Sequence, residues 1–223
     1  MAKVSFIDKR VFKKFLEITA VASGTLSFVV IFVDIPAKWK LTVGLAFLAL
    51  LALTYLAIWL WSNNLNSIEI NVEGSDVAIK TGDIFQQPGL KAIAFNEYFD
   101  TQVDNKIIGE TSLNGVFIQK HLGVPLSELD SHIEEYAFDD SEVLEENEAR
   151  KQGKKKRYQI GTICLYKDYL LTAFSKFDEN NKALLTMPEY LEFLINFWDK
   201  VNNVYAQQSV STTIFGSGIT RIK

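Results

Sequence analysis

Three short segments rich in glycine or polar residues contain the side chains of this sequence that are best suited to chemistry. They are Gly82-Asp83-Ile84, the stretch that begins at Asn96, and Gly216-Ser217-Gly218. A glycine-rich turn that leads into a helix exposes backbone N–H groups, which together with the helix dipole suit a phosphate or a diphosphate. A carboxylate such as Asp83 can accept a hydrogen bond from a base amine, and the amide of Asn96 can bind a ribose hydroxyl. The segments indicate a nucleotide-like ligand, although each also fits an ordinary turn, cap or strand end.

The sequence shows no arrangement of residues that is typical of a catalytic site or of a metal site. The imidazoles are His121 and His132, and the single cysteine is Cys164, so no zinc-like spacing and no intramolecular disulfide is available. Serines, threonines and aspartates are frequent, but none is paired with a base in a recognisable pattern. We therefore expect a binding module rather than an enzyme, with no catalytic residue, no metal and no cofactor.

The three segments must be positioned by a sheet and its helices. Alternating or apolar runs predict strands at residues 68–72, 77–80, 91–95 and 210–215, and a hairpin over 158–174 that turns near Lys167. Helices are predicted at 113–122, at 126–136 and behind the capping box formed by Thr186 and Glu189. Strands mixed with helices predict a sheet covered by helices, and ligands bind such sheets at the carboxyl ends of their strands.

The last predicted helix has an apolar stripe at helical spacing, which we expect to face the core: Leu191, Leu194, Ile195, Trp198, Val201 and Tyr205.

Charge is distributed unevenly along the chain. Residues 68–223 contain 16 basic and 24 acidic residues, a balance of −8, which argues against broad nucleic-acid binding. Within this part, an acid-rich stretch at 130–148 is followed by a basic one at 150–157. Adjacent blocks of opposite sign predict an exposed, solvated loop.

Two apolar segments near the N-terminus predict a membrane anchor. Residues 41–61 form 21 consecutive uncharged positions, and a helix of that length spans roughly 30 Å, the thickness of a hydrocarbon core. Residues 15–33 form a second apolar stretch with one acid, Glu17. The short connection contains Pro36, so the two segments should form a transmembrane helical hairpin.

Basic residues set the expected orientation of this hairpin. Five precede the first span, and only two lie in the connection: Lys3, Lys9, Arg10, Lys13 and Lys14 against Lys38 and Lys40. The positive-inside rule keeps the N-terminus in the cytoplasm, and two crossings return the following domain to the same side.

At the three segments considered first, the chain resembles the macro domain family, whose fold binds ADP-ribose. Gly82-Asp83-Ile84 matches the family's Gly-Asp-Ile, whose aspartate contacts the adenine, and 91–96 resembles the strand that ends in the asparagine near the distal ribose. Residues 215–219 resemble the second phosphate loop, while 111–115 would replace the usual glycine run of the first. The ligand contacts implied are Asp83, Ile84, Asn96, Ser112, Leu113, Gly216, Ser217, Gly218, Ile219 and Thr220.

The resemblance is closer to one branch, the macro-type ThsA effectors of Thoeris anti-phage defence. It rests on residues 96–101, 111–115 and 216–221 behind a two-helix anchor. It implies an α/β fold class: a membrane anchor at 1–67 with transmembrane helices at 15–33 and 41–61, then a macro-like mixed-sheet domain with helices on both faces at 68–223. A macro fold normally continues beyond the position of Lys223, so a minimal version of the fold and a truncated fragment both remain open.

The same resemblance implies a role in the bacterial inner membrane. A partner TIR-domain enzyme converts NAD into an ADP-ribose-type signal, the macro domain binds this signal, and the anchor, assembled as a homo-oligomer, disrupts the lipid bilayer. Two alternatives stay open from the sequence, a membrane-tethered ADP-ribosyl hydrolase and a structural adaptor without a small ligand.

Overall fold

The computed structural model describes residues 4–33, 35–178 and 180–216, and it divides the chain into two compact units, residues 1–81 and 82–223. The hairpin at 67–80, which the sequence analysis included in the second domain, groups with the first unit. We describe each unit by itself.

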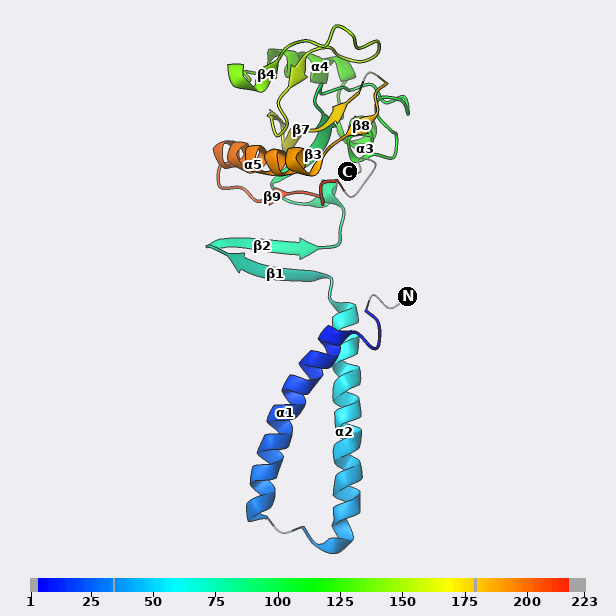
Figure 1. The fold of residues 1–223 in the computed structure, drawn as a ribbon, viewed down its shortest axis with the longest axis vertical. Coiled ribbons are helices and arrows are strands. Elements are labelled where there is room, and N and C mark those ends of the chain that lie inside the picture. The colour runs from blue at the N-terminus through cyan, green and yellow to red at the C-terminus, as the bar shows by residue number, and fades with distance from the viewer. Residues whose placement is uncertain (1–3, 34, 179, 217–223) are drawn as a thin grey trace. The chain divides into compact units, whose positions relative to one another are not determined.

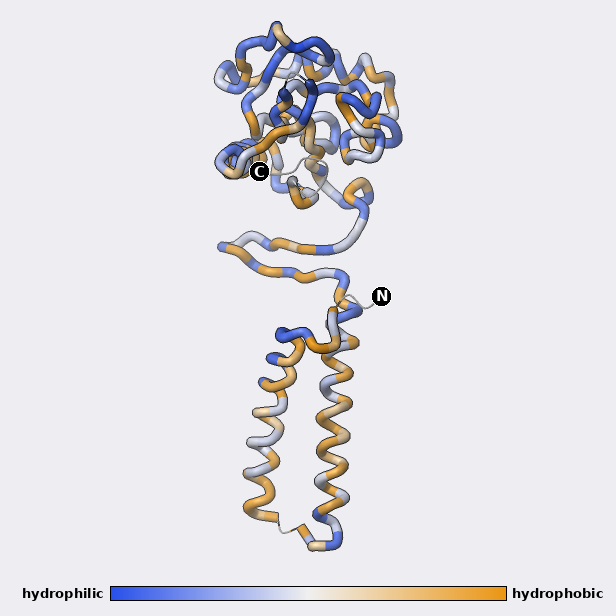
Figure 2. Tube along the Cα trace, turned by 45° about the vertical axis from the view of Figure 1, so that its right-hand side comes forward, coloured by the Kyte–Doolittle hydropathy of each residue, from blue (hydrophilic) through white to orange (hydrophobic). Residues whose placement is uncertain are grey.

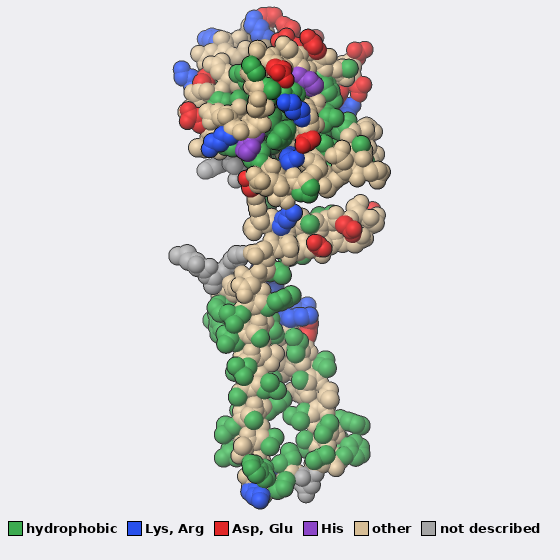
Figure 3. All heavy atoms as spheres, turned by 180° about the vertical axis from the view of Figure 1, so that it is seen from behind, with side chains coloured by type: hydrophobic (Ala, Val, Ile, Leu, Met, Phe, Trp, Pro, Cys, Tyr) green, Lys and Arg blue, Asp and Glu red, His purple; other side chains and the backbone are tan. Residues whose placement is uncertain are grey.

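The first unit contains two long helices, α1 (Lys9–Phe32) and α2 (Ala37–Asn64). The Asp8 side chain accepts a hydrogen bond from the backbone N–H of Arg10 and so caps α1. Both helices are long and apolar enough to cross a membrane, and no residue in the apolar window of either is buried. Hydrophobic residues follow one another along both of them (Figure 2), and Figure 3 shows their side chains on the surface of the helices. The two predicted spans therefore correspond closely to the observed helices.

An N-terminal segment ties the start of the chain to the C-terminal end of α2. The Trp59 indole Nε1 donates to the Val4 carbonyl at 3.1 Å, and the Tyr55 hydroxyl donates to the Phe6 carbonyl. The Phe6 ring meets the rings of Tyr55 and Trp59 edge-on, with centroids 5.1 and 5.5 Å apart. These aromatic and polar contacts fix the ends of the two helices that lie near the basic N-terminus.

A two-stranded hairpin follows α2 after two residues. Its strands are β1 (Ser67–Val72) and β2 (Ser75–Lys80), which pair antiparallel through six residue pairs. The turn residues Glu73 and Gly74 both have positive φ, of 50° and 88°, as a two-residue hairpin turn requires. All twelve strand residues are exposed.

The second unit is built on a mixed sheet with the order β6-β7-β3-β9, and β8 pairs with β7 outside this path. Figure 1 labels β3, β7, β8 and β9 of this sheet. The strands are β3 (Leu90–Asn96), β6 (Ile163–Tyr166), β7 (Tyr169–Phe177), β8 (Ala183–Leu184) and β9 (Val210–Ser211). Strand β3 is parallel to β7 and to β9, whereas β6 and β7 form the antiparallel hairpin predicted around Lys167. The last strand is shorter than the predicted 210–215.

The remaining elements of the second unit surround this sheet. They are the 3-10 turns η1 (Ile84–Gln86) and η3 (Asp140–Glu142), the helices α3 (Leu113–Val116), α4 (Leu126–Glu135) and α5 (Met187–Val204), the π-helical turn η2 (Phe117–His121), and the strand pair β4 (Val143–Leu144) and β5 (Arg157–Tyr158). The predicted helix at 113–122 is thus α3 continued by a π-helical turn.

Two hydrophobic clusters show that helices cover both faces of the sheet. Strand residues such as Ile93 and Leu171 pack with Phe117, Leu129 and Ile133 of η2 and α4. On the opposite face, β3 and β7 contribute a second set that packs with α5: Ala92, Leu170 and Phe174 against Phe193, Phe197 and Val201. This confirms the expected mixed-sheet α/β domain with helices on both faces.

The predicted core stripe of α5 is wrong in part. Phe193 and Phe197 are fully buried, whereas Leu191, Ile195 and Trp198 are 47–71% exposed. The helix begins as predicted, since the capping box of Thr186 and Glu189 is present. Its apolar residues form two adjacent stripes, and the one that meets the sheet contains the phenylalanines.

Candidate functional site

A cavity of about 350 Å³ lies at the carboxyl ends of β3, β7 and β9. Because β7 and β9 both run parallel to β3, the carboxyl ends of the three strands meet at one edge of the sheet. The lining comprises Ala94, Phe95 and Asn96 from β3, Phe174, Ser175 and Phe177 from β7, Ala183 from β8, Thr213 to Gly216 after β9, and Ile107 to Gly109 with Thr111 to Asn114. Its size falls in the range typical of small-molecule sites, and mixed apolar and polar walls suit a nucleotide-like ligand.

One wall of the cavity is a tight loop that leads into α3. The Ser112 hydroxyl donates to the Gly109 carbonyl at 2.5 Å and accepts from the Gly115 N–H at 3.2 Å, so Ser112 caps the helix. A Cβ on Gly115 would lie 2.3 Å from the Gly109 carbonyl oxygen. Only glycine allows the two backbone segments to approach so closely, and this fixes the shape of the wall.

Asn96 ends β3 at the cavity and is 4% exposed. Its Oδ1 accepts from the backbone N–H groups of Tyr98 and Asp100 at 3.1 and 3.3 Å, and its Nδ2 donates to Asp100 Oδ2 at 2.8 Å. Asn96 therefore satisfies the strand-end backbone, one of its two predicted roles, while it also lines the cavity. In the same turn, Phe99 is fully buried at φ 48°, a conformation that side chains rarely adopt and that tertiary packing must hold.

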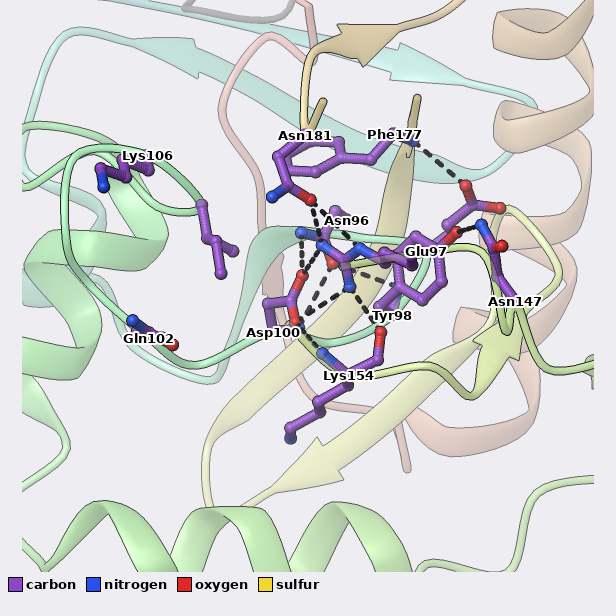
Figure 4. A network of polar contacts seen from close by, with 12 residues as sticks. Asn96, Glu97, Tyr98, Asp100, Gln102, Lys106, Asn147, Lys154, Phe177 and Asn181 are labelled. Atoms are coloured by element: carbon purple, nitrogen blue, oxygen red, sulfur yellow. Dashed lines mark hydrogen bonds and ion pairs between the residues drawn. The ribbon is translucent and has the colours of Figure 1, made fainter. Parts of the chain in front are cut away.

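Asp100 connects this turn to a buried ion pair (Figure 4). Arg150 Nη2 lies 2.6 Å from Asp100 Oδ2, and the two side chains are 0% and 2% exposed. Arg150 also donates to the Asn181 Oδ1 and to the Lys154 carbonyl, so all five of its N–H donors have an acceptor. Asp100 additionally accepts from the Lys154 N–H at 2.8 Å. This network, residues 96, 100, 150, 154 and 181, is the polar clamp.

Aromatic and acidic side chains enclose the polar clamp. The guanidinium carbon of Arg150 lies 3.8 Å from the centroid of the Tyr98 ring, a cation–π contact in a desolvated position. The Tyr98 hydroxyl accepts from Asn147 Nδ2 at 2.9 Å. Beside it, Glu97 is 4% exposed and accepts from the Phe177 N–H at 3.1 Å. Burial raises the pKa of Glu97 above its usual value, and the hydrogen bond from Phe177 and the nearby Arg157 oppose that shift.

The expectation that residues 150–157 form an exposed loop is therefore wrong for Arg150. Gly153, at φ 92°, closes the loop over the ion pair, because a Cβ there would lie 2.7 Å from both Arg150 Nη1 and Asp100 Oδ1. A glycine inside a basic run was the one sequence signal that could have indicated a folded loop. Neither Asp100 nor Asn181 stood out as a partner for Arg150.

The structure brings four of the predicted ligand contacts together at the cavity, namely Asn96, Ser112, Leu113 and Gly216. Asp83 and Ile84 do not belong to its lining: Asp83 is exposed and caps η1 by accepting from the Phe85 N–H at 3.0 Å, and Ile84 is buried. Their assigned contact with an adenine stays a prediction. The remaining four, Ser217, Gly218, Ile219 and Thr220, lie outside the described residues.

The potential metal ligands in the described part of the chain are histidine, cysteine and acidic side chains. Across residues 4–33, 35–178 and 180–216, no three histidine, cysteine or acidic side chains are grouped so that they could hold an ion. Cys164 is fully buried in the sheet, and burial raises the pKa of its thiol to about 12, so it is not a reactive thiolate. The groups that the cavity offers are hydrogen-bond donors and acceptors and apolar walls, which suit binding.

The mixed sheet, its two helical layers and a cavity at the carboxyl ends of parallel strands define a macro-like α/β domain. The family model of the macro domain of the Thoeris protein ThsA matches residues 77–223. The chain is also 36% identical over 220 residues to the Thoeris protein ThsA of Bacillus amyloliquefaciens (strain Y2), an alignment that covers 96% of this chain and 73% of that protein. The chain therefore belongs to the ThsA macro-domain family.

Proposed function

We propose that this protein is a membrane-anchored effector of anti-phage defence whose macro domain binds an ADP-ribose-derived signal. Membership of the ThsA macro-domain family supports the defence role and the ligand class. The observation that carries the proposal is the cavity where β3, β7 and β9 end, because it joins Asn96, the Ser112 loop and Gly216 in one site.

In this proposal each part of the site binds a different part of the ligand. The Ser112 loop and the turn at Gly216 face a phosphate-bearing group, and Asn96 approaches a ribose. The rings of Phe174 and Phe215 supply apolar walls for the uncharged parts. Asp83, which lies outside the cavity lining, binds the adenine.

The second part of the proposal concerns the membrane. Helices α1 and α2 cross the bacterial inner membrane with the N-terminus and the macro domain in the cytoplasm, as Lys3 and the basic residues in the first turns of α1 favour. A TIR-domain enzyme makes the signal, and signal binding shifts the protein toward a homo-oligomer that disrupts the bilayer. Such a shift requires the signal to bind the assembled state more tightly than the resting one.

Calorimetry on the full chain in detergent micelles tests ligand binding, with ADP-ribose and amino-acid conjugates of ADP-ribose as the ligands. Ala94 lies in the cavity wall, so Ala94→Leu should fill part of the cavity and weaken binding by at least about tenfold, or 1.4 kcal/mol. Ala137 is exposed on the same domain, and Ala137→Leu should leave binding unchanged. Absence of heat with all these ligands, or equal binding by the Ala94 variant, would refute the site.

Mass spectrometry of the ligand after incubation separates a binding module from a hydrolase. Intact ligand recovered from an equimolar mixture supports binding alone, whereas release of free ADP-ribose from a conjugate would favour the enzyme.

Dye release from vesicles that contain the full chain tests the membrane step. Release that depends on the ligand is expected, and a ligand-independent leak would contradict the proposed control.

A further inference from the structure

The β1–β2 hairpin has one apolar face and one polar face. Directly opposite residues of an antiparallel pair point to the same side, and the register pairs Ile68 with Ile79, Ile70 with Val77, and Val72 with Ser75. Five aliphatic side chains therefore share one face. The other face presents Ser67, Glu69, Asn71, Asp76, Ala78 and Lys80.

This apolar face has no cover within the described part of its unit. The side chains of Ile68, Ile70, Val72, Val77 and Ile79 are between 40% and 61% exposed. A two-stranded hairpin is marginally stable alone in water and needs further strands or a packed layer on its apolar face. An ordered hairpin with five exposed β-branched aliphatics thus indicates a binding partner.

Charge argues against an anionic lipid surface as that partner. Residues 67–80 contain Glu69, Glu73 and Asp76 against the single base Lys80, a balance of −2. Anionic headgroups attract basic segments and repel acidic ones, and residues that favour the membrane interface are tryptophan and tyrosine, which the hairpin lacks.

We propose that the apolar face of the hairpin packs against the same face of a second copy of this chain. The inference rests on the membrane anchoring proposed above, and not on the identity of the signal. In such a pair the acids Glu69 and Asp76 point away from the contact on both copies, so like charges are not buried. Only two residues, Leu65 and Asn66, separate the end of α2 from β1. Copies anchored by α2 therefore present their hairpins at the same height above the bilayer.

The size of the face explains why the anchor is needed. Six residues at about 3.3 Å and two strands about 4.8 Å apart give a face of roughly 200 Å² per copy. Stable interfaces in solution bury roughly 1,000 Å² or more in total. The hairpin contact alone is too small to hold two free copies together, but confinement in a bilayer raises the effective concentration of the partner. A contact of this size is reversible.

Cysteine crosslinking of the full chain in vesicles of phosphatidylethanolamine and phosphatidylglycerol tests the proposal. Ile70 and Val77 form the central pair of the apolar face, so a two-fold axis would bring their counterparts close together. Ile70→Cys and Val77→Cys should give about tenfold more dimer with a short bismaleimide than Glu69→Cys and Ala78→Cys, which form a pair on the opposite face. The wild-type chain gives the background, because its only cysteine, Cys164, is buried.

Four outcomes overturn the proposal. Equal dimer yield at both faces indicates random collision in the bilayer. Protection of the thiol introduced by Ile70→Cys from a water-soluble maleimide, without dimer formation, assigns the cover to lipid or to another part of the same chain. Flotation of the same vesicles reports anchoring separately: a chain that floats but does not crosslink refutes the hairpin contact alone, and a chain that does not float refutes the anchoring and the contact with it.

Discussion

Replacing Arg150 with methionine removes the cationic half of the buried ion pair and keeps an unbranched side chain of similar length. Asp100 would then retain the Asn96 Nδ2 and the Lys154 N–H as donors but lose its countercharge, and Asn181 Oδ1 would lose both of its contacts with the guanidinium. Breaking a buried pair from one side costs about 3–5 kcal/mol, because the remaining charge stays desolvated. For a domain of this size, that loss lowers the melting temperature by roughly 10 °C.

The single cysteine provides the assay. Cys164 is fully buried in the sheet of the second unit, so a fluorogenic thiol reagent reacts with it only when this unit opens. Thermal unfolding of the full chain in micelles can thus be followed at one position of the macro domain, independently of helices α1 and α2.

A matched control separates the ion pair from charge removal in general. Lys155 pairs with Glu148, but these side chains are 46% and 73% exposed, and exposed pairs contribute less than about 1 kcal/mol. Lys155→Met should therefore leave the melting temperature nearly unchanged. The double variant Arg150→Met with Asp100→Asn should recover part of the loss, since no unpaired charge remains. If Arg150→Met has the same melting temperature as Lys155→Met, the polar clamp does not stabilise the domain and the reasoning fails.

Three further predictions use the thermal assay or the calorimetry described above. Phe197→Ala should destabilise the domain by about 3–5 kcal/mol, whereas the neighbouring Trp198→Ala should change little, because only Phe197 is buried; similar losses would contradict the observed face of α5. The pKa of Glu189 is lowered to about 2, first by its hydrogen bond from Lys176. The stability that ionised Glu189 adds to the folded state is therefore fully present above its unfolded pKa of 4.5, and it is lost as the pH falls toward 2. Wild type should therefore lose stability relative to Glu189→Gln across that range, and parallel pH profiles would count against this. Gly115→Ala should weaken ligand binding in calorimetry, because its new methyl group meets a carbonyl oxygen at 2.3 Å and forces the cavity wall to move; undiminished affinity would show that the wall tolerates the shift.

Local signals in the sequence predicted the elements that depend on neighbouring residues. The capping box at Thr186 begins α5, the turn at Lys167 joins β6 and β7, and the apolar run that ends at Asn96 is the buried strand β3. In each case, residues within a few positions determine the structure, so composition and spacing are sufficient.

The face of α5 could not be predicted in the same way. Leu191, Ile195 and Trp198 have helical spacing, and so do Phe193, Phe197 and Val201. Periodicity identifies an apolar stripe but does not say which of two adjacent stripes meets the sheet. That choice depends on the crossing of α5 over β3 and β7, which is a tertiary property.

The polar clamp was missed for a related reason. Arg150 and Asp100 are fifty positions apart, and Asn181 comes from a third segment. Local charge density suggested a solvated loop, since basic runs are usually exposed. A buried arginine is recognisable only when its acceptors are known, and here they belong to three separate backbone segments.

Asn96 belongs both to the polar clamp and to the cavity wall, so the clamp affects ligand binding as well as stability. Asn96 lines the cavity, and its amide is held by three hydrogen bonds, one of them to the carboxylate that Arg150 neutralises. If this asparagine were mobile, a ligand that contacts it would have to order its side chain, which costs about 0.5–1.5 kcal/mol of binding free energy. Because folding has already fixed Asn96, a ligand that contacts it does not bear that loss. Arg150, although fully buried and absent from the cavity lining, therefore contributes to affinity through the orientation of Asn96, and its replacement should weaken the binding of a nucleotide-like signal even at temperatures where the domain remains folded.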